Sequence, residues 1–122
     1  MIRDISIVIP IYNEQDNIIQ LIREVRASLE KKINYEIIIV DDGSDDNTYE
    51  VLNKINKNII IISHKKNYGQ SIGLRTGIIE ANSEYIVTLD GDGQNDPKDI
   101  PKLIKSFDTK VSYMMVIGNS VN

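Results

Sequence analysis

The chain of 122 residues contains no cysteine and no tryptophan, and it has a single histidine and a single phenylalanine. Without cysteine, neither a disulfide nor a thiolate metal site can form. No apolar run approaches the roughly 18 residues that a membrane-spanning helix needs. Arg3 and Asp4 lead straight into a short strand-like run and not into a signal peptide. We therefore expect a cytoplasmic protein.

Positive charge is also scarce. The chain has 14 lysine and arginine residues against 18 acidic ones, for a net charge of -4, and its basic residues cluster in nothing longer than pairs. Proteins that bind mainly nucleic acid neutralise phosphates with clustered basic side chains. Nucleic acid is therefore excluded as the main partner, although a divalent cation could still bridge an acidic protein to an anionic nucleotide.

Apolar, β-branched runs recur at regular intervals and predict strands over residues 5–11, 35–40, 58–63, 85–89 and 111–117. Apolar residues at helical spacing lie between them, at Ile18, Ile22, Val25 and Leu29 and in shorter stripes over 51–55 and 100–107. Strands so rich in isoleucine and valine are typical of a sheet covered on both faces. We therefore expect one α/β domain over residues 1–122, with a doubly wound, mostly parallel sheet.

Helix boundaries are marked by capping and turn residues. Ser44 is placed to cap a helix that begins near Asp45, and Asp96-Pro97 predicts a turn before a helix that begins near Asp99. The helical pattern over 69–82 is weak, because glycines stand at positions 69, 73 and 77. Their spacing leaves a bare stripe, which favours close packing of the helix on the sheet over contact with a phosphate.

Polar clusters follow three of the predicted strands, at residues 10–14, 41–45 and 90–94. Parallel strands share one carboxyl edge, and in α/β sheets ligands bind at that edge. One acidic strand end is often only a turn or a helix cap. Three of them on one edge favour a binding site.

The third cluster, Asp90-Gly91-Asp92-Gly93-Gln94, carries the clearest chemistry. Two carboxylates two residues apart leave the strand end together, and glycines between and after them let the backbone turn sharply. Oxygen ligands of this kind suit Mg²⁺ or Mn²⁺ that is also held by a substrate's phosphates. The cluster therefore predicts metal-assisted chemistry on a diphosphate.

Several other kinds of site are excluded. The chain has neither a G-x-x-x-x-G-K-[ST] loop nor a G-x-G-x-x-G turn after its first strand. A calcium loop that began at Asp90 would need glycine where Asn95 stands and glutamate where Pro101 stands. We expect the single histidine, His64, to be an ordinary surface residue at a strand end.

Three segments stand in a characteristic order: Ile9-Pro10-Ile11-Tyr12-Asn13-Glu14, Val40-Asp41-Asp42-Gly43-Ser44 and Leu89-Asp90-Gly91-Asp92. In order and spacing they resemble the N-terminal half of a family 2 glycosyltransferase with the GT-A fold. The resemblance covers about residues 5–107, includes Asn67-Tyr68-Gly69-Gln70-Ser71 and Leu74-Arg75-Thr76-Gly77, and leaves a divergent tail over about 108–122. Gln94-Asn95-Asp96-Pro97 is similar to the branch that transfers sugars to polyprenyl or dolichyl phosphate, as in dolichyl-phosphate mannosyltransferase.

The resemblance implies roles for particular residues. Pro10, Tyr12 and Glu14 would line the nucleotide pocket, with Tyr12 near the base. Asp42 would bind the base or ribose, and Asp41 would support that loop. Gln70 and Arg75 would lie near the diphosphate or the base. The acidic pair, Asp90 and Asp92, would face the metal and the sugar diphosphate as catalytic residues, with Gln94 as a further metal ligand.

The resemblance also implies an activity and partners. The protein would transfer a hexose from a UDP- or GDP-sugar, with Mg²⁺ or Mn²⁺, to an acceptor such as a polyprenyl phosphate. It would work in the cytoplasm, peripherally at the inner face of the membrane, in the synthesis of cell-envelope glycans. The acceptor-binding half of the family is not within these 122 residues, so we expect a truncated domain that self-associates or is completed by a second polypeptide.

Two alternatives stay open. The chain could be an inactive remnant or a module that only binds nucleotide sugars. A nucleotidyltransferase that makes sugar nucleotides shares the general architecture, but it would show a glycine-rich signature with a basic residue after the first strand, where this chain has Tyr12-Asn13-Glu14.

Overall fold

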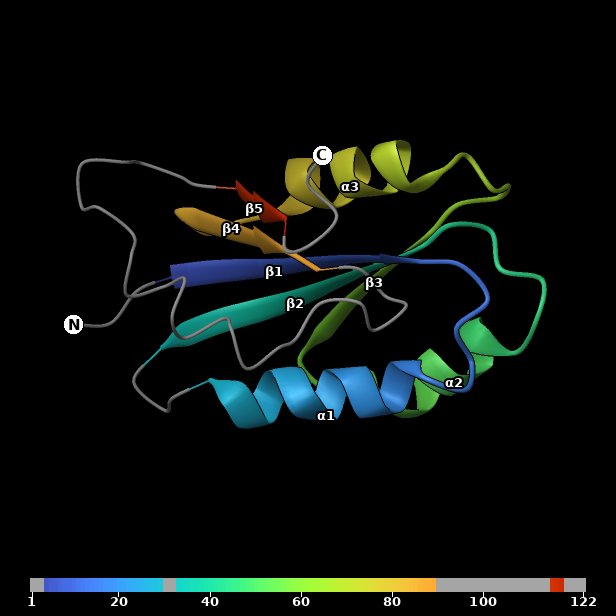
Figure 1. The fold of residues 1–122 in the computed structure, drawn as a ribbon, viewed down its shortest axis with the longest axis horizontal. Coiled ribbons are helices and arrows are strands. Elements are labelled where there is room, and N and C mark those ends of the chain that lie inside the picture. Colours follow the sequence, from blue (N-terminus) through green and yellow to red (C-terminus); the bar gives the residue numbers. More distant parts are fainter. Residues whose placement is uncertain (1–3, 30–32, 90–114, 118–122) are drawn as a thin grey trace.

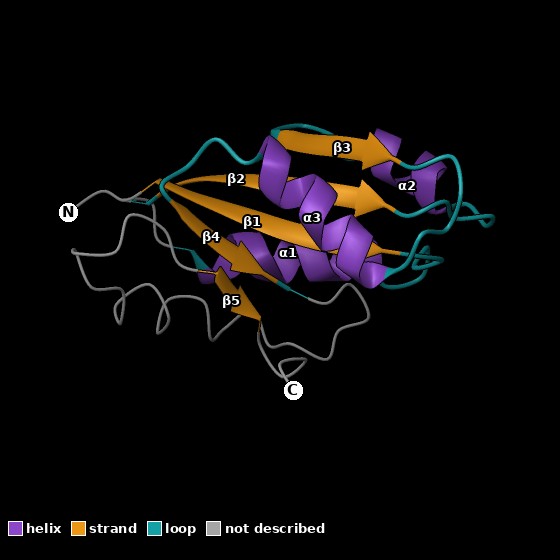
Figure 2. Ribbon diagram, turned by 90° about the horizontal axis from the view of Figure 1, so that it is seen from above, coloured by secondary structure: helices purple, strands orange, loops and turns teal. Residues whose placement is uncertain are grey.

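The computed structural model describes residues 4–29, 33–89 and 115–117. In this part of the chain one sheet has the strand order β3-β2-β1-β4-β5, as Figure 2 shows. The strands are β1 Asp4–Ile11, β2 Asn34–Asp41, β3 Ile59–Ser63, β4 Tyr85–Thr88 and β5 Met115–Ile117. All four strand pairs are parallel. The chain adds strands outward from β1 in both directions, which confirms the doubly wound sheet.

Three helices are described, α1 Ile18–Ser28, α2 Thr48–Lys54 and α3 Gln70–Glu80. Figure 1 shows α1 and α2 below the sheet and α3 above it. Alternate residues of β1 therefore enter different layers of the core, because side chains along a strand point to opposite faces. Ile7 and Ile9 pack on the layer that contains α1, whereas Val8 packs with Leu74 and Ile78 of α3. Among the described residues, no helix has both the length and the hydropathy needed to cross a bilayer.

The glycines of α3 explain why this helix forms against its local propensity. Gly73 and Gly77 are both buried on the sheet. A Cβ on Gly73 would lie 3.0 Å from the Pro10 Cβ, and a Cβ on Gly77 would lie 2.3 Å from the Val8 Cγ1. The prediction of close helix–sheet packing is therefore confirmed, and the helix approaches β1 more closely than any side chain would allow.

We expect Gly77→Ala to lower the free energy of unfolding by about 2 kcal/mol, because overpacking a filled core outweighs the gain in helix propensity. Urea denaturation measures the change. Ser71→Ala is the matched control, since Ser71 is exposed on the same helix and its replacement should change stability by less than about 0.5 kcal/mol. Equal stability of both variants would contradict the packing described above.

A cluster of polar contacts holds the chain just after the C-terminal end of α3. The Glu36 carboxylate, near the start of β2, accepts hydrogen bonds from the Ser6 hydroxyl, from the Asn82 amide at 2.8 Å and from the Asn82 side chain at 3.3 Å. The Ser83 amide donates to the Ser6 hydroxyl at 3.2 Å. Burial raises the pKa of Glu36, but these hydrogen bonds outweigh it and hold the pKa below the ordinary value.

One capping prediction is wrong. Helix α2 begins at Thr48 with Asn47 at its cap position, so Ser44 does not cap it. The Ser44 hydroxyl instead accepts a hydrogen bond from the Asn13 amide at 2.8 Å. The Ser44 hydroxyl, which the local sequence predicted to cap the helix, therefore binds the loop after β1 instead. The helix predicted over 100–107, with its start at Asp96-Pro97 or Asp99, lies outside the described residues.

Candidate functional site

The loops that follow β1 and β2 are bound to each other at the carboxyl edge of the sheet. The Asn13 amide donates to the Ser44 hydroxyl, and the Asp45 amide donates to the Asn13 side-chain oxygen at 3.0 Å. Asn13 has φ 54, the left-handed conformation that asparagine tolerates better than most residues. The first two polar clusters of the sequence therefore meet at the carboxyl edge of the sheet, as their strand order predicted. We call this part of the edge the rim.

Two further hydrogen bonds tie the first loop to the start of α2. The Glu14 amide donates to the Thr48 hydroxyl at 2.9 Å, and the Asn47 amide donates to the Gln15 side chain at 2.7 Å. The Glu14 carbonyl also accepts from the amide of Ile18, which begins α1. The loop over residues 12–15 is thus held by both neighbouring helices, with Tyr12 left 42% exposed above it.

Asp41 is the last residue of β2 and Asp42 follows it, and both are buried. The Asp41 carboxylate accepts from the Ser44 amide at 3.1 Å, which shapes the turn after the strand. Its carbonyl accepts from the His64 amide at 2.9 Å, so the ends of β2 and β3 are joined. The carboxylate and the carbonyl of Asp41 therefore hold the turn after β2 and the end of β3 in place.

The Asp42 carboxylate is the centre of the rim. Its Oδ1 accepts from the Tyr68 amide at 2.9 Å and from the His64 ring at 2.8 Å. Its Oδ2 accepts from the Gly69 amide at 2.8 Å and from the Asn67 side chain at 3.1 Å. A carboxylate offers about four lone-pair positions, and here all are used by donors of this chain. Direct contact of this carboxylate with a base or ribose would require one of these bonds to open.

These contacts set the charge of Asp42. Burial raises its pKa, but the hydrogen bond from His64 and those from the Tyr68 and Gly69 amides outweigh burial, and the pKa lies below the ordinary aspartate value. Asp42 is therefore ionised at neutral pH and acts only as an acceptor.

His64 is not the ordinary surface residue that the sequence predicted. Its side chain is only 13% exposed, and its ring nitrogens contact the carboxylate of Asp42 and, at 2.9 Å, the hydroxyl of Thr76 on α3. The ring also meets Tyr68 edge-on, with centroids 5.4 Å apart. Sequence reasoning missed both Thr76 and the Asn67 contact. The only local signal was the segment Asn67-Tyr68-Gly69, which follows a strand and ends in a glycine.

The other predicted nucleotide residues lie around this rim at different depths. Pro10 is buried in β1 under Gly73, and Glu14 is half-buried in the first loop. Gln70 is exposed as the first residue of α3, directly after Gly69. Arg75 is exposed on α3, five residues beyond Gln70, which places it about 7 Å further along the helix axis. The structure thus brings Tyr12, Glu14, Asp41, Asp42 and Gln70 to one edge.

Asp90, Asp92 and Gln94, the predicted metal ligands, lie outside the described residues. The Leu89 amide donates to the Val8 carbonyl at 3.0 Å, so pairing with β1 continues up to the residue before Asp90. Within residues 4–29, 33–89 and 115–117, no three histidine or acidic side chains lie close enough together to hold a metal ion.

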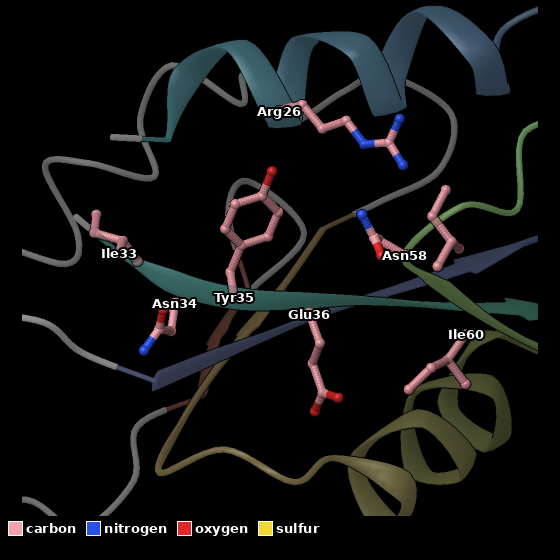
Figure 3. A pocket seen from close by; sticks show the side chains of 8 residues that line it. Arg26, Ile33, Asn34, Tyr35, Glu36, Asn58 and Ile60 are labelled. Carbon is pink, nitrogen blue, oxygen red and sulfur yellow. The ribbon is translucent and has the colours of Figure 1, made fainter. Parts of the chain in front are cut away.

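A hollow that sequence reasoning did not predict lies at the opposite edge of the sheet, where β2 and β3 begin. It has a volume of about 580 Å³. Figure 3 shows Arg26, Tyr35 and Asn58 on the α1 side of the sheet, and Glu36 and Ile60 pointing toward α3. The Arg26 guanidinium donates to the Lys57 carbonyl at 2.7 Å. The hollow is thus separate from the strand ends that carry the polar clusters.

Two curated relatives show what the sequence is similar to. An undecaprenyl-phosphate 4-deoxy-4-formamido-L-arabinose transferase of Pseudomonas fluorescens is 38% identical over 121 residues, in a match that covers 95% of this chain and 36% of the relative. A protein of the same name from Yersinia pestis is 43% identical over 108 residues, 84% of this chain and 33% of the relative. The chain spans about a third of the length of these relatives.

Solved glycosyltransferases share the fold at low identity. TarS of S. aureus, in complex with UDP-GlcNAc, matches with a TM-score of 0.70 at 23% identity, over 84% of this chain and 30% of that one. Glucosyl-3-phosphoglycerate synthase of Mycobacterium tuberculosis, with Mn²⁺ and UDP-glucose, matches with a TM-score of 0.67 at 22% identity, over 84% and 38%. The fold is therefore the GT-A fold that the sequence resemblance implied. The family model for glycosyl transferase family 2 matches residues 6–120, and this chain belongs to that family.

Proposed function

We propose that this chain carries the donor site of a glycosyltransferase that moves a sugar from a nucleoside diphosphate to a polyprenyl phosphate. The observation that carries the proposal is the rim itself. The loop after β1 is bound to the loop after β2, and the segment after β3 is bound to the ionised Asp42, at the sheet edge where α/β proteins bind ligands. The curated relatives are named for a substituted arabinose, so the proposal extends to sugars other than hexoses.

The proposed nucleotide pocket uses the exposed residues of the rim. In this proposal Tyr12 offers an aromatic face to the base and Glu14 lines the pocket from the same loop, whereas the buried Pro10 supports the pocket from the end of β1. Gln70 and Arg75 reach the base or the diphosphate from α3. Asp41 and Asp42 contribute by holding the loops in position, because their carboxylates are already engaged. Two solved structures with a similar fold are complexes with UDP-GlcNAc and with GDP-mannose. This supports a nucleotide sugar as the donor.

Asp90, Asp92 and Gln94 would hold the divalent cation in this proposal. Their donor set consists of carboxylate and amide oxygens, which fits Mg²⁺ or Mn²⁺. When bound, the cation would neutralise the charge that develops on the leaving nucleoside diphosphate. Two of the fold neighbours are described with Mn²⁺, and this supports a divalent metal without deciding which one.

The reaction needs no general base if the acceptor is a polyprenyl phosphate. A phosphate oxygen is ionised near neutral pH, and it would form the new bond to the anomeric carbon from the face opposite the leaving group. The bond between the anomeric carbon and the diphosphate oxygen would break, and its electron pair would stay on that oxygen. Because attack and departure occur on opposite faces, the configuration would invert. Such an acceptor would place the complete enzyme at the inner face of the membrane, in cell-envelope glycan synthesis, with a further polypeptide segment or a second chain around the lipid.

The test is calorimetric titration with UDP- and GDP-sugars, with and without Mn²⁺. We expect Asp92→Ala to abolish the gain in affinity that Mn²⁺ provides, a loss of about tenfold or more, or about 1.4 kcal/mol. Asp16→Ala, at an exposed aspartate near the start of α1, is the matched control and should bind as the parent does. Mn²⁺-dependent binding that survives Asp92→Ala would contradict the metal assignment.

Transfer of a radiolabelled sugar to a polyprenyl phosphate separates the two candidate functions. Transfer by the chain alone supports a complete enzyme. Metal-dependent binding without transfer would assign the chain to nucleotide-sugar binding, and the absence of any nucleotide binding would overturn the donor site.

A further inference from the structure

His64 joins three segments at the rim. Its Nδ1 lies 2.8 Å from the Asp42 Oδ1, its Nε2 lies 2.9 Å from the Thr76 Oγ1, and its amide donates to the Asp41 carbonyl. The ring also contacts the Tyr68 ring edge-on. Since its backbone and both ring nitrogens are engaged, the imidazole has one orientation in this structure.

The partners decide which nitrogen carries a proton. Asp42 is ionised and can only accept, so Nδ1 is the donor in this pair. In the neutral ring Nε2 then accepts from the Thr76 hydroxyl, and in the charged ring Nε2–H donates to the same oxygen. A hydroxyl serves either role by rotating. The contact with Asp42 therefore persists in both charge states of the ring.

The Asp42 carboxylate in turn determines the path of the chain into α3. Its two oxygens accept hydrogen bonds from the amides of Tyr68 and Gly69, and α3 begins at the next residue, Gln70. Gly69 adopts φ 103, a conformation that side-chain-bearing residues rarely take. If the carboxylate rotated, both amides would lose their acceptor and the positions of Tyr68 and Gln70 would change.

We propose that His64 is the positioning residue of the donor site: its Nδ1–H fixes the Asp42 carboxylate, which holds Tyr68 and Gln70 where a nucleotide would meet them. This inference rests on the proposed function for its effect on binding. The ring acts on the site through its contact with Asp42.

Two amide substitutions test which ring nitrogen matters. His64→Asn places an N–H donor at the position of Nδ1 and can still reach Asp42, whereas His64→Gln places it at the position of Nε2, toward Thr76. We expect His64→Gln to weaken binding of UDP or GDP with Mn²⁺ by about tenfold, which is about 1.4 kcal/mol. His64→Asn and Thr76→Val should stay within about threefold of the parent, because both keep the bond to Asp42.

Amide hydrogen exchange gives a readout that does not depend on the nucleotide. We expect the Tyr68 and Gly69 amides to exchange faster in His64→Gln and to remain protected in His64→Asn. Ser28→Ala removes a side-chain hydrogen bond to the Val25 carbonyl at the far end of α1 and should change neither amide. Urea denaturation of each variant separates this local effect from a global loss of stability.

The outcomes separate the two proposals. Equal behaviour of His64→Asn and His64→Gln in both measurements would overturn the positioning role, because packing of the ring alone would then account for any change. If the parent binds nucleotide and His64→Gln binds equally well, only the positioning role fails. A parent that binds no nucleotide overturns the donor site and, with it, the role of His64 in binding.

Discussion

Replacing Gly43 with alanine is expected to lower the free energy of unfolding by about 3 kcal/mol or more and to displace the loop that carries Asn67. Gly43 follows Asp42 with φ +74, a left-handed conformation. An added Cβ would lie 2.3 Å from the Lys66 carbonyl carbon and 2.6 Å from the Asn67 nitrogen. These are backbone atoms, so no change of rotamer relieves the contact.

Urea denaturation at neutral pH measures this loss, and Gly69→Ala is its matched control. Gly69 also has positive φ, at +103, but a Cβ there would meet nothing within 4 Å. Its replacement therefore has only the conformational cost of a backbone region that is favoured by glycine alone, about 1–3 kcal/mol. A larger loss for Gly43→Ala than for Gly69→Ala reports the steric contact at Gly43. Equal losses would contradict the close approach of the two loops.

The second large effect is expected from Asp42→Asn, which keeps the shape of the side chain and removes its charge. One oxygen becomes an amide group that faces two hydrogen-bond donors, for example the Gly69 amide and the Asn67 side chain. Leaving these part-buried donors without an acceptor, and removing the charge that faces His64, should cost about 3 kcal/mol at neutral pH. Urea denaturation of parent and variant measures this difference.

The difference between parent and variant should also depend on pH. The pKa of Asp42 in the folded state lies below its ordinary value of 3.8, so its stabilisation is fully present above that value. It is lost as the pH falls through the lower folded-state pKa. We therefore expect a constant difference from neutral pH down to about pH 4 and a smaller one in stronger acid.

Asp45→Asn is the control for this series, because Asp45 is an exposed aspartate on the same loop. Glu36 and Asp46 also have lowered pKa values, but they are present in parent and variant alike, so their effects cancel in the difference. A difference that stayed constant into strong acid would show that charge is not what Asp42 contributes.

The fold could be predicted from the sequence because its signals are local. Continuous isoleucine and valine runs identify buried parallel strands, and the glycines of α3 identified close packing once the helix was assumed. Ser44 shows where such reasoning fails. Its hydroxyl could serve a helix cap or the Asn13 amide, and only the position of the neighbouring loop decides between them.

The candidate site was predictable only in part for the same reason. The order of the strands placed the clusters after β1 and β2 on one rim. The environment of His64 was not predictable, because its partners Asp42 and Thr76 lie 22 and 12 residues away along the chain. They reach the ring only through the placement of β3 beside β2 and of α3 across the sheet. Contacts of this kind carry no periodic or motif signal.

The carboxylates of Glu36, near the start of β2, and of Asp42, directly after the strand, have a joint consequence for motion. Asp42 accepts hydrogen bonds from the amides of the two residues just before α3, and Glu36 accepts one from the amide of Asn82 just after it. Any axial translation of α3 along β2 would stretch both sets of bonds in the same step, so shear of this helix over the sheet is opposed at both of its ends. Motions that bring Gln70 toward or away from a ligand should therefore be tilts about one of these anchors.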